Sequence, residues 1–138
     1  MERMEPSTLA QLLRRRVAAG PLLIDVSGVS MGRRMVGARR VEAVRARRPV
    51  PGQVWVFVTE EGRLVAHRCL MGGRRPRFQG DANSLPDGPV PPSCLVGRVS
   101  AVETAGGWKA LGIADRLCGV VVLGRHLLAH LRRHVGRR

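Results

Sequence analysis

Residues 56–68 read VFVTEEGRLVAHR, two apolar runs that are joined by a short polar stretch. Valine-rich runs that flank a glycine-containing turn, here Glu61-Gly62, are typical of a β-hairpin. We therefore expect residues 55–58 and 64–68 to lie side by side as antiparallel strands. The run VWVFV at 54–58 is apolar throughout, which predicts a strand that is buried on both faces.

Outward from this hairpin, the chain consists largely of short apolar runs separated by glycine and proline, the pattern of strands joined by turns. Strands are predicted at residues 22–27, 39–46, 53–60, 63–71 and 94–103. The segment 72–93 reads GGRRPRFQGDANSLPDGPVPPS and is unusually long for a structureless connection in a small protein. Such connections are commonly functional, so we expect residues 72–93 to contribute to a site.

Helices are expected near the two ends of the chain. One is predicted at 7–19, with Ser7 or Thr8 as its N-cap and a glycine-proline pair directly after it. Leucines at helical spacing predict a second helical segment at about 115–135. The expected fold class is mainly β, with twisted antiparallel sheets and short terminal helices. The length of 138 residues suits one domain, 1–138.

The net charge of +14, from 24 basic and 10 acidic residues, would attract phosphate groups at long range. Only Lys109 among the basic residues is a lysine, and an arginine, alanine, glycine and valine bias also follows from GC-rich coding, whatever the partner. No helix-turn-helix, zinc-finger or aromatic RNA-binding pattern accompanies the charge. Nucleic acid is therefore kept as a less favoured partner.

The three cysteines, Cys69, Cys94 and Cys118, have no CxxC spacing and stand among apolar neighbours, which predicts buried reduced thiols. No metal site and no cofactor are expected. The longest apolar stretch, at 117–131, is interrupted by arginine and histidine and predicts no transmembrane helix. We expect a cytoplasmic protein without a signal peptide; contact of the arginine run 14–16 with a membrane surface stays open.

Ser30 lies in VSGVSMGRRM (residues 26–35), and His67 lies in the middle of a predicted strand. A serine hydroxyl attacks a carbonyl only when a nearby base takes its proton, and a carboxylate improves that base by orienting it. The long segment supplies two carboxylates, Asp81 and Asp87. Each residue also has an ordinary interpretation: Ser30 as a strand end, His67 as a core or surface histidine, and the aspartates as turn formers.

The order of the motifs carries more information than any one of them. GVSM, PGQVWVF, VAHR, QGDANSLPDGPV and LVGRV follow one another along residues 22–102. In this order they resemble the motifs of the signal peptidase and LexA-type serine peptidase superfamily. The resemblance implies a signal peptidase/LexA-like β fold with its core at 22–102.

Within that superfamily, the His-Arg pair in VAHR resembles the archaeal and reticulum type, which uses histidine as base where other members use lysine. The resemblance implies Ser30 as nucleophile, His67 as general base and Asp87 as the carboxylate that orients it. Asp81, six positions before Asp87, would shape the loop. Supporting roles are implied for Gly28, Met31 and Arg68.

The expected function is therefore a soluble serine endopeptidase that cleaves a peptide or protein precursor, which it binds as an extended strand. The sequence also departs from the family pattern, with Arg33 in place of a proline, Ala38-Arg39 in place of Gly-Asp, and Gln53 in place of an aspartate. Two alternatives stay open: an inactive peptidase-fold module that binds an extended peptide, and a basic nucleic-acid-binding protein.

Overall fold

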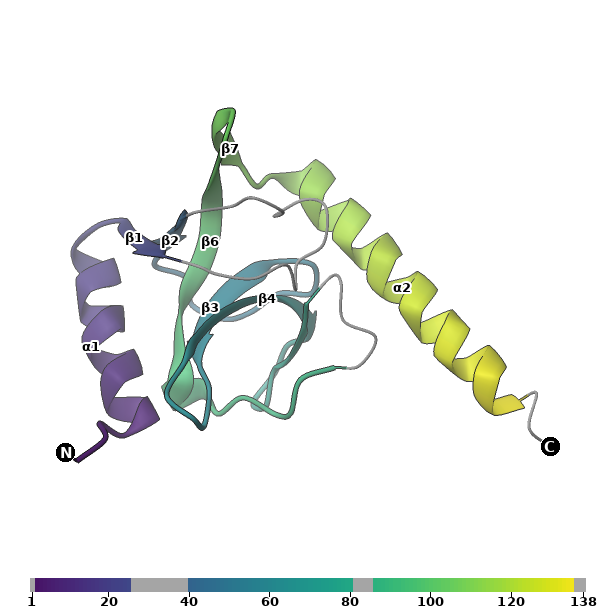
Figure 1. Cartoon of the computed structure of the whole chain (residues 1–138), viewed down its shortest axis with the longest axis horizontal. Helices are drawn as coiled ribbons and strands as arrows, with labels where there is room; N and C mark the ends of the chain where they lie inside the picture. The colour runs from purple at the N-terminus through teal and green to yellow at the C-terminus, as the bar shows by residue number, and fades with distance from the viewer. Residues whose placement is uncertain (1, 26–39, 81–85, 136–138) are drawn as a thin grey trace.

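The computed structural model describes residues 2–25, 40–80 and 86–135 of the chain (Figure 1). The described strands form one seven-stranded antiparallel sheet, with one helix before it and one after it in the sequence. The prediction of a mainly β protein is confirmed.

The elements follow one another in a simple order along the chain. They are α1 (Pro6–Ala19), β1 (Leu22–Asp25), β2 (Arg40–Val44), β3 (Val54–Val58), β4 (Leu64–Met71), β5 (Arg77–Gln79), the 3-10 helix η2 (Pro92–Cys94), β6 (Leu95–Thr104), β7 (Gly107–Ala110) and α2 (Ile113–Val135). The strands are ordered β1-β2-β6-β3-β4-β5 in the sheet, and β7 pairs with β6.

The predicted hairpin is confirmed as β3 and β4, which pair with Trp55 opposite His67 and Val58 opposite Leu64. The turn between them is closed by the backbone bonds Thr59 N–H to Arg63 C=O and Gly62 N–H to Thr59 C=O, both 2.8 Å. Gly62 has a φ of +81°, a conformation that residues with a Cβ adopt only with strain. All five residues of β3 are buried, as its uninterrupted apolar run predicts.

Two strands were not predicted. β5 lies inside the segment 72–93, which was expected to be irregular, and pairs with β4 through Arg68 opposite Gln79. β7 pairs with β6 through Val102 opposite Lys109. Both are short, and both are stabilised by pairing with a longer neighbour rather than by an apolar run of their own.

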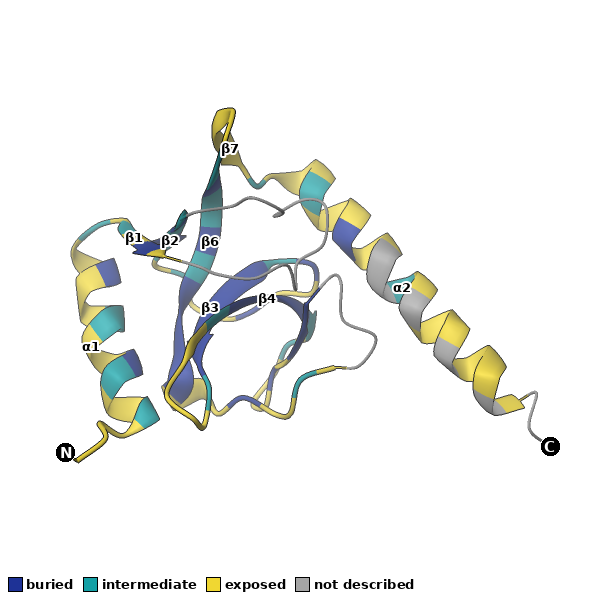
Figure 2. Ribbon diagram, in the orientation of Figure 1, coloured by how far each residue is buried: buried dark blue, intermediate teal, exposed yellow. Residues whose placement is uncertain are grey.

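The described residues pack into two hydrophobic clusters, one on each face of β3. Figure 2 shows β3 in the colour of buried residues. Successive side chains of a strand point to opposite faces, so Val54, Val56 and Val58 join the first cluster, which includes α1, β2 and β6. Trp55 and Phe57 join the second, with Cys69, Phe78, Val90, Cys94 and Leu95. We call the second the aromatic cluster, and it forms the floor of the site described below.

Helix α1 begins at Pro6, and the prediction of Ser7 or Thr8 as N-cap is wrong. Proline suits the first helical position because its φ is already fixed near the helical value and its missing N–H would have no partner there. The cap position falls to Glu5, which makes no capping bond with its side chain. The helix end before Gly20 is as predicted.

Helix α2 runs from Ile113 to Val135, close to the predicted 115–135. Its first turns contact the sheet, and Figure 1 shows its C-terminal part extending away from it. Within the described residues, neither helix combines the length and the apolar character that a membrane span requires.

All three cysteines are free thiols, but only two are buried. Cys69 and Cys94 are in the aromatic cluster, as the apolar neighbours of each predict. Cys118 is exposed on α2, so the prediction of burial is wrong for this residue. Its apolar neighbours belong to a helix that packs against the sheet only at its start.

Alkylation by iodoacetamide at about pH 8 should therefore modify Cys118 and leave Cys69 intact. The thiolate is the reactive species, and burial raises the pKa of Cys69 to about 11, so very little thiolate forms there at that pH. Peptide mass spectrometry should find an adduct on Cys118 but none on Cys69 in the folded protein, and adducts on both after denaturation. An adduct on Cys69 of a protein whose circular dichroism is unchanged would contradict the described packing.

Candidate active site

Strand β4 brings His67 and Arg68 into the middle of the protein on opposite sides of the sheet. The strand lies between β3 and β5, and residues 66–69 are all buried. Because side chains alternate along a strand, His67 shares its face with Val65 and Cys69, next to the aromatic cluster. Arg68 faces the other way, towards α2.

His67 is hydrogen-bonded through Nδ1 to the carboxylate oxygen Oδ2 of Asp87. The two residues are 20 positions apart, and the segment 72–93 returns the chain to β4. The Asp87 backbone is held in place because its N–H donates to the Phe78 carbonyl of β5 at 2.8 Å. The histidine side chain is 9% exposed and the aspartate 29%, so water reaches the pair from the carboxylate side.

Aromatic rings fix the plane of the imidazole. Phe57 meets the His67 ring edge to face, with ring centroids 6.0 Å apart and an interplanar angle of 72°. Phe57 is itself stacked on Phe78 at 4.9 Å. A histidine held by a carboxylate at one nitrogen and by a ring at its side has a fixed orientation, which an ordinary surface histidine lacks.

A cavity of about 680 Å³ opens over this pair. Its lining includes His67 and Asp87, with Phe57, Val65 and Cys94 as its apolar surface. Charged side chains of the β3–β4 turn lie at the same cavity, among them Glu61. Hydrogen bonds from its own backbone and from the Thr59 side chain lower the pKa of Glu61. The cavity therefore joins an apolar surface to a polar, charged one, as binding sites for peptides and small ligands do.

Four of the predicted site residues lie outside the described residues: Gly28, Ser30, Met31 and Asp81. The structure describes the chain up to Asp25, the end of β1, and from Arg40, the start of β2. The structure thus shows that His67 and Asp87 are in contact at a cavity. The position of Ser30, the expected nucleophile, stays a prediction.

Arg68, expected to support the site, lies instead on the opposite face of β4 from His67. Its guanidinium, 1% exposed, donates through Nη1 to the Gly52 carbonyl at 2.7 Å and to Asp115 Oδ2 at 3.1 Å. Asp115 is in the first turn of α2. Arg68 therefore attaches α2 to the sheet, a pairing over 47 residues that the sequence does not indicate.

Gln53, which stands where the family pattern has an aspartate, has a structural role. Its side-chain Oε1 accepts hydrogen bonds from the Val50 N–H and from Trp55 Nε1, both at 3.1 Å. Glutamine supplies the acceptor that this turn requires without a charge next to a buried tryptophan. The departure from the pattern is thus compatible with the fold of β3 and β4.

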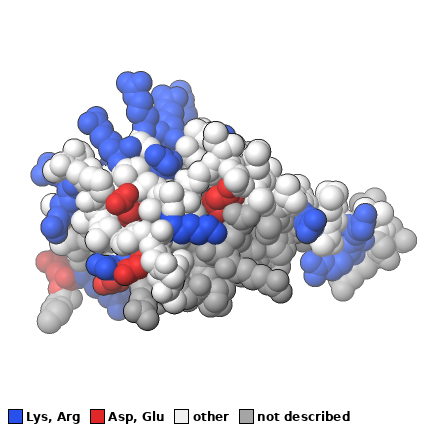
Figure 3. All heavy atoms as spheres, turned by 90° about the horizontal axis from the view of Figure 1, so that it is seen from above, with Lys and Arg blue, Asp and Glu red and all other residues white. Residues whose placement is uncertain are grey.

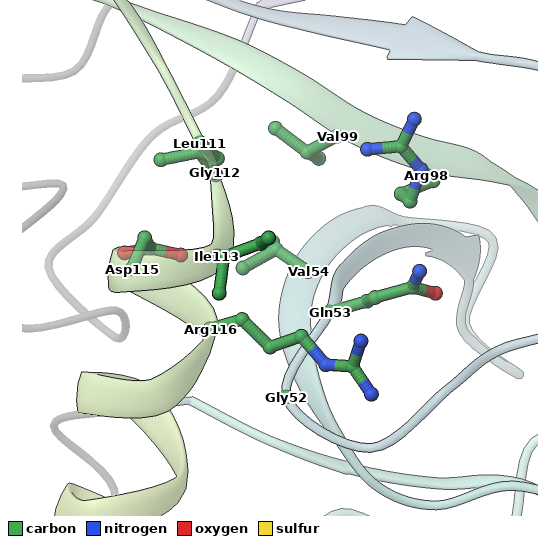
Figure 4. A pocket seen from close by; sticks show the side chains of 10 residues that line it. All are labelled: Gly52, Gln53, Val54, Arg98, Val99, Leu111, Gly112, Ile113, Asp115 and Arg116. Carbon is green, nitrogen blue, oxygen red and sulfur yellow. The ribbon is translucent and has the colours of Figure 1, made fainter.

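A second, smaller cavity of about 200 Å³ lies between the start of α2 and strands β3 and β6 (Figure 4). Gln53, Arg98 and Arg116 line it from three different segments of the chain, as the sticks show. Arg116 is held there because its Nε donates to the Pro51 carbonyl at 2.8 Å. His67 and Asp87 do not line this cavity.

Among the described residues, no group of three histidine, cysteine, aspartate or glutamate side chains is placed as metal ligands would be. Comparison of the chain with models of protein families, with curated proteins and with solved structures found no match. The functional interpretation therefore depends on the geometry of the site and on the motifs of the sequence.

Proposed function

We propose that this protein is a serine endopeptidase that cleaves a peptide or protein precursor through an acyl-enzyme intermediate. The observation that carries the proposal is the hydrogen bond between His67 and Asp87 at the edge of a cavity. Ser30 is the proposed nucleophile, on the strength of the motif GVSM and its resemblance to the peptidase pattern. His67 is the proposed base and Asp87 the group that orients it.

The chemistry follows from which imidazole nitrogen bonds the carboxylate. With Nδ1–H donated to Asp87, neutral His67 carries its basic lone pair on Nε2. As Ser30 Oγ forms a bond to the substrate carbonyl carbon, its proton passes to Nε2, and Asp87 stabilises the resulting imidazolium. His67 then gives the proton to the leaving amine as the C–N bond breaks, which leaves the acyl group on Ser30.

Water completes the proposed reaction. His67 removes a proton from the water that attacks the ester, the ester C–O bond breaks, and Ser30 Oγ recovers its proton from His67. Backbone N–H groups around Gly28 and Ser30 are the proposed donors to the negatively charged oxygen of each tetrahedral intermediate. The apolar surface of Phe57, Val65 and Cys94 would hold a small substrate side chain, with the peptide itself extended.

A peptide library digested in ¹⁸O-labelled water tests this proposal without knowledge of the natural substrate. Wild-type protein should generate new peptide ends whose carboxyl groups carry ¹⁸O, because the ester is opened by solvent water. Ser30→Ala should generate none, since the acyl-enzyme cannot form. Thr8→Ala, which removes an exposed hydroxyl from α1, should cleave like the wild type.

Undiminished cleavage by a purified, folded Ser30→Ala protein would refute the proposed nucleophile. Absence of cleavage by the wild type across the library, combined with saturable binding of some peptides, would favour the second candidate, an inactive module that holds an extended peptide. That candidate is supported by the same cavity and by the departures at Arg33 and Ala38-Arg39.

A further inference from the structure

Helix α2 carries an apolar side that the described part of the protein does not cover (Figure 2). We call it the α2 apolar face. Its members are 50% to 77% exposed and, at 100° per residue, fall within about a third of the helix circumference. They are Ile113, Leu117, Val121, Leu127, Leu128, Leu131 and Val135.

The contacts of α2 with Arg68 lie on a different side of the helix from Leu117, whereas Val120, within the apolar arc, packs against Gly52, where an added Cβ would lie 3.0 Å from its Cγ2. Asp115 bonds Arg68, and Gly119 is so close to the same side chain that a Cβ there would lie 2.1 Å from Arg68 Nε. Leu117 is two positions from each of these residues, which turns it about 200° around the helix axis. Near its start the helix therefore rests on the sheet through Asp115, Gly119 and Val120, while Leu117 and Val121 face in another direction.

Arginines accompany this face, and acidic residues do not. Arg125 and Arg132, seven residues apart, follow one border of the apolar face, whereas Arg133 lies on the opposite side of the helix; all three are exposed. Figure 3 shows the basic side chains near the far end of α2. The one acidic residue in the sequence 113–135 is Asp115, which is bonded to Arg68.

We propose that α2 binds the surface of a membrane that contains anionic lipids, lying parallel to it with the apolar face between the headgroups. A helix with an exposed apolar side and arginines at its border has the chemistry that such surfaces bind. Its 23 residues give a contact about 34 Å long. The arginines would contact lipid phosphates, and the proposal is independent of whether the protein cleaves peptides.

A second copy of the chain fits this face less well. Positions 117, 121, 124, 128, 131 and 135 have the alternating spacing of a coiled coil, but a glycine occupies one of them. In a parallel pair, Arg125 and Arg132 would face valine or leucine; in an antiparallel pair they would face each other. Neither arrangement offers them a carboxylate, whereas a phosphate-bearing surface complements them.

Sedimentation of the full-length protein with lipid vesicles tests the proposal. The protein should co-sediment with vesicles of phosphatidylcholine that contain about one-third phosphatidylglycerol. Much less protein should co-sediment with vesicles of phosphatidylcholine alone. High salt should weaken the binding because it screens the arginines. Simultaneous Arg125→Glu and Arg132→Glu substitutions should lower the partition coefficient by about 100-fold.

A matched control separates this face from the net charge of the protein. Arg47→Glu with Arg48→Glu makes the same change in charge at exposed positions outside α2, and should lower binding far less. Leu128→Ser with Leu131→Ser, which leaves the charge intact, should lower binding by about tenfold. Circular dichroism confirms that each variant is folded.

Three results would overturn the proposal. The first is a wild-type protein that does not sediment with the anionic vesicles. The second is an equal loss of binding in the Arg47→Glu, Arg48→Glu control, which would assign binding to the overall charge. The third is a wild-type dimer in analytical ultracentrifugation that the Leu128→Ser, Leu131→Ser protein no longer forms, because a second copy would then cover the face.

Discussion

In the Asp87→Asn protein, kcat/KM for peptide cleavage is expected to fall by about 10,000-fold while the fold is kept. Asparagine has nearly the shape of aspartate, but its amide can donate to Nδ1 of His67, which would then place the imidazole proton on Nε2. In that tautomer Nε2 cannot take the proton from Ser30. Loss of the negative charge also destabilises the imidazolium that forms during attack.

A double-mutant cycle tests whether Asp87 acts through His67. Residues that act as one unit have strongly non-additive effects, so Asp87→Asn should cost little further activity in a protein that already carries His67→Ala. The measurement is kcat/KM on a peptide taken from the library digestion. Asp25→Asn, at an exposed carboxylate outside the cavity, is the matched control and should cleave normally.

Two outcomes would remove Asp87 from the proposed role. One is cleavage by Asp87→Asn within about tenfold of the wild type. The other is additivity, in which the two substitutions multiply their separate effects, because independent residues behave in that way. The melting temperature of each protein is measured in parallel, so that unfolding is not mistaken for lost chemistry.

The Gly119→Ala protein is expected to lose about 3 kcal/mol of its free energy of unfolding. The new methyl carbon would lie 2.1 Å from Arg68 Nε and 2.2 Å from its Cζ, so the guanidinium would have to move. That movement breaks its bonds to Asp115 and to the Gly52 carbonyl, and disrupting a buried ion pair typically costs about 3–5 kcal/mol. The better helix propensity of alanine offsets about 1 kcal/mol of this.

The same helix provides the control for this substitution. No heavy atom lies within 4 Å of a Cβ placed at Gly124, so Gly124→Ala should raise the free energy of unfolding by up to about 1 kcal/mol. Chemical denaturation followed by circular dichroism measures both, and the Gly119→Ala melting temperature should be about 10 °C lower than that of the wild type. Equal shifts in the two variants would show that Arg68 does not hold α2 at Gly119.

The sequence predicted the elements whose pattern is local. The β3–β4 hairpin followed from apolar runs around Glu61-Gly62, and the helical spacing of leucines located α2 to within two residues of its start. β5 was missed because three residues that include Arg77 and Gln79 have no apolar pattern of their own. β5 forms because it pairs with β4, and a local sequence pattern does not reveal that pairing.

Contacts over long separations were harder to predict. The pairing of Arg68 with Asp115 joins a strand to a helix that follows three further strands, and no motif marks it. The burial expected of Cys118 was wrong because apolar neighbours indicate burial only where a helix is covered along its length. His67 and Asp87 could be proposed as partners only because the order of several motifs resembled a family pattern; their catalytic roles and that of Ser30 stay predictions.

The adjacency of His67 and Arg68 in β4 has a consequence for how this strand can vary. A slip of one residue in its pairing with β3 would exchange the two side chains between the faces of the sheet. The guanidinium would then enter the aromatic cluster without Asp115, and the imidazole would lie beneath α2 without Asp87. Asp87 on one side of the sheet and Asp115 on the other thus select a single alignment of β4 with β3. An insertion or deletion of one residue between Arg63 and His67 would therefore be far more damaging than most substitutions there.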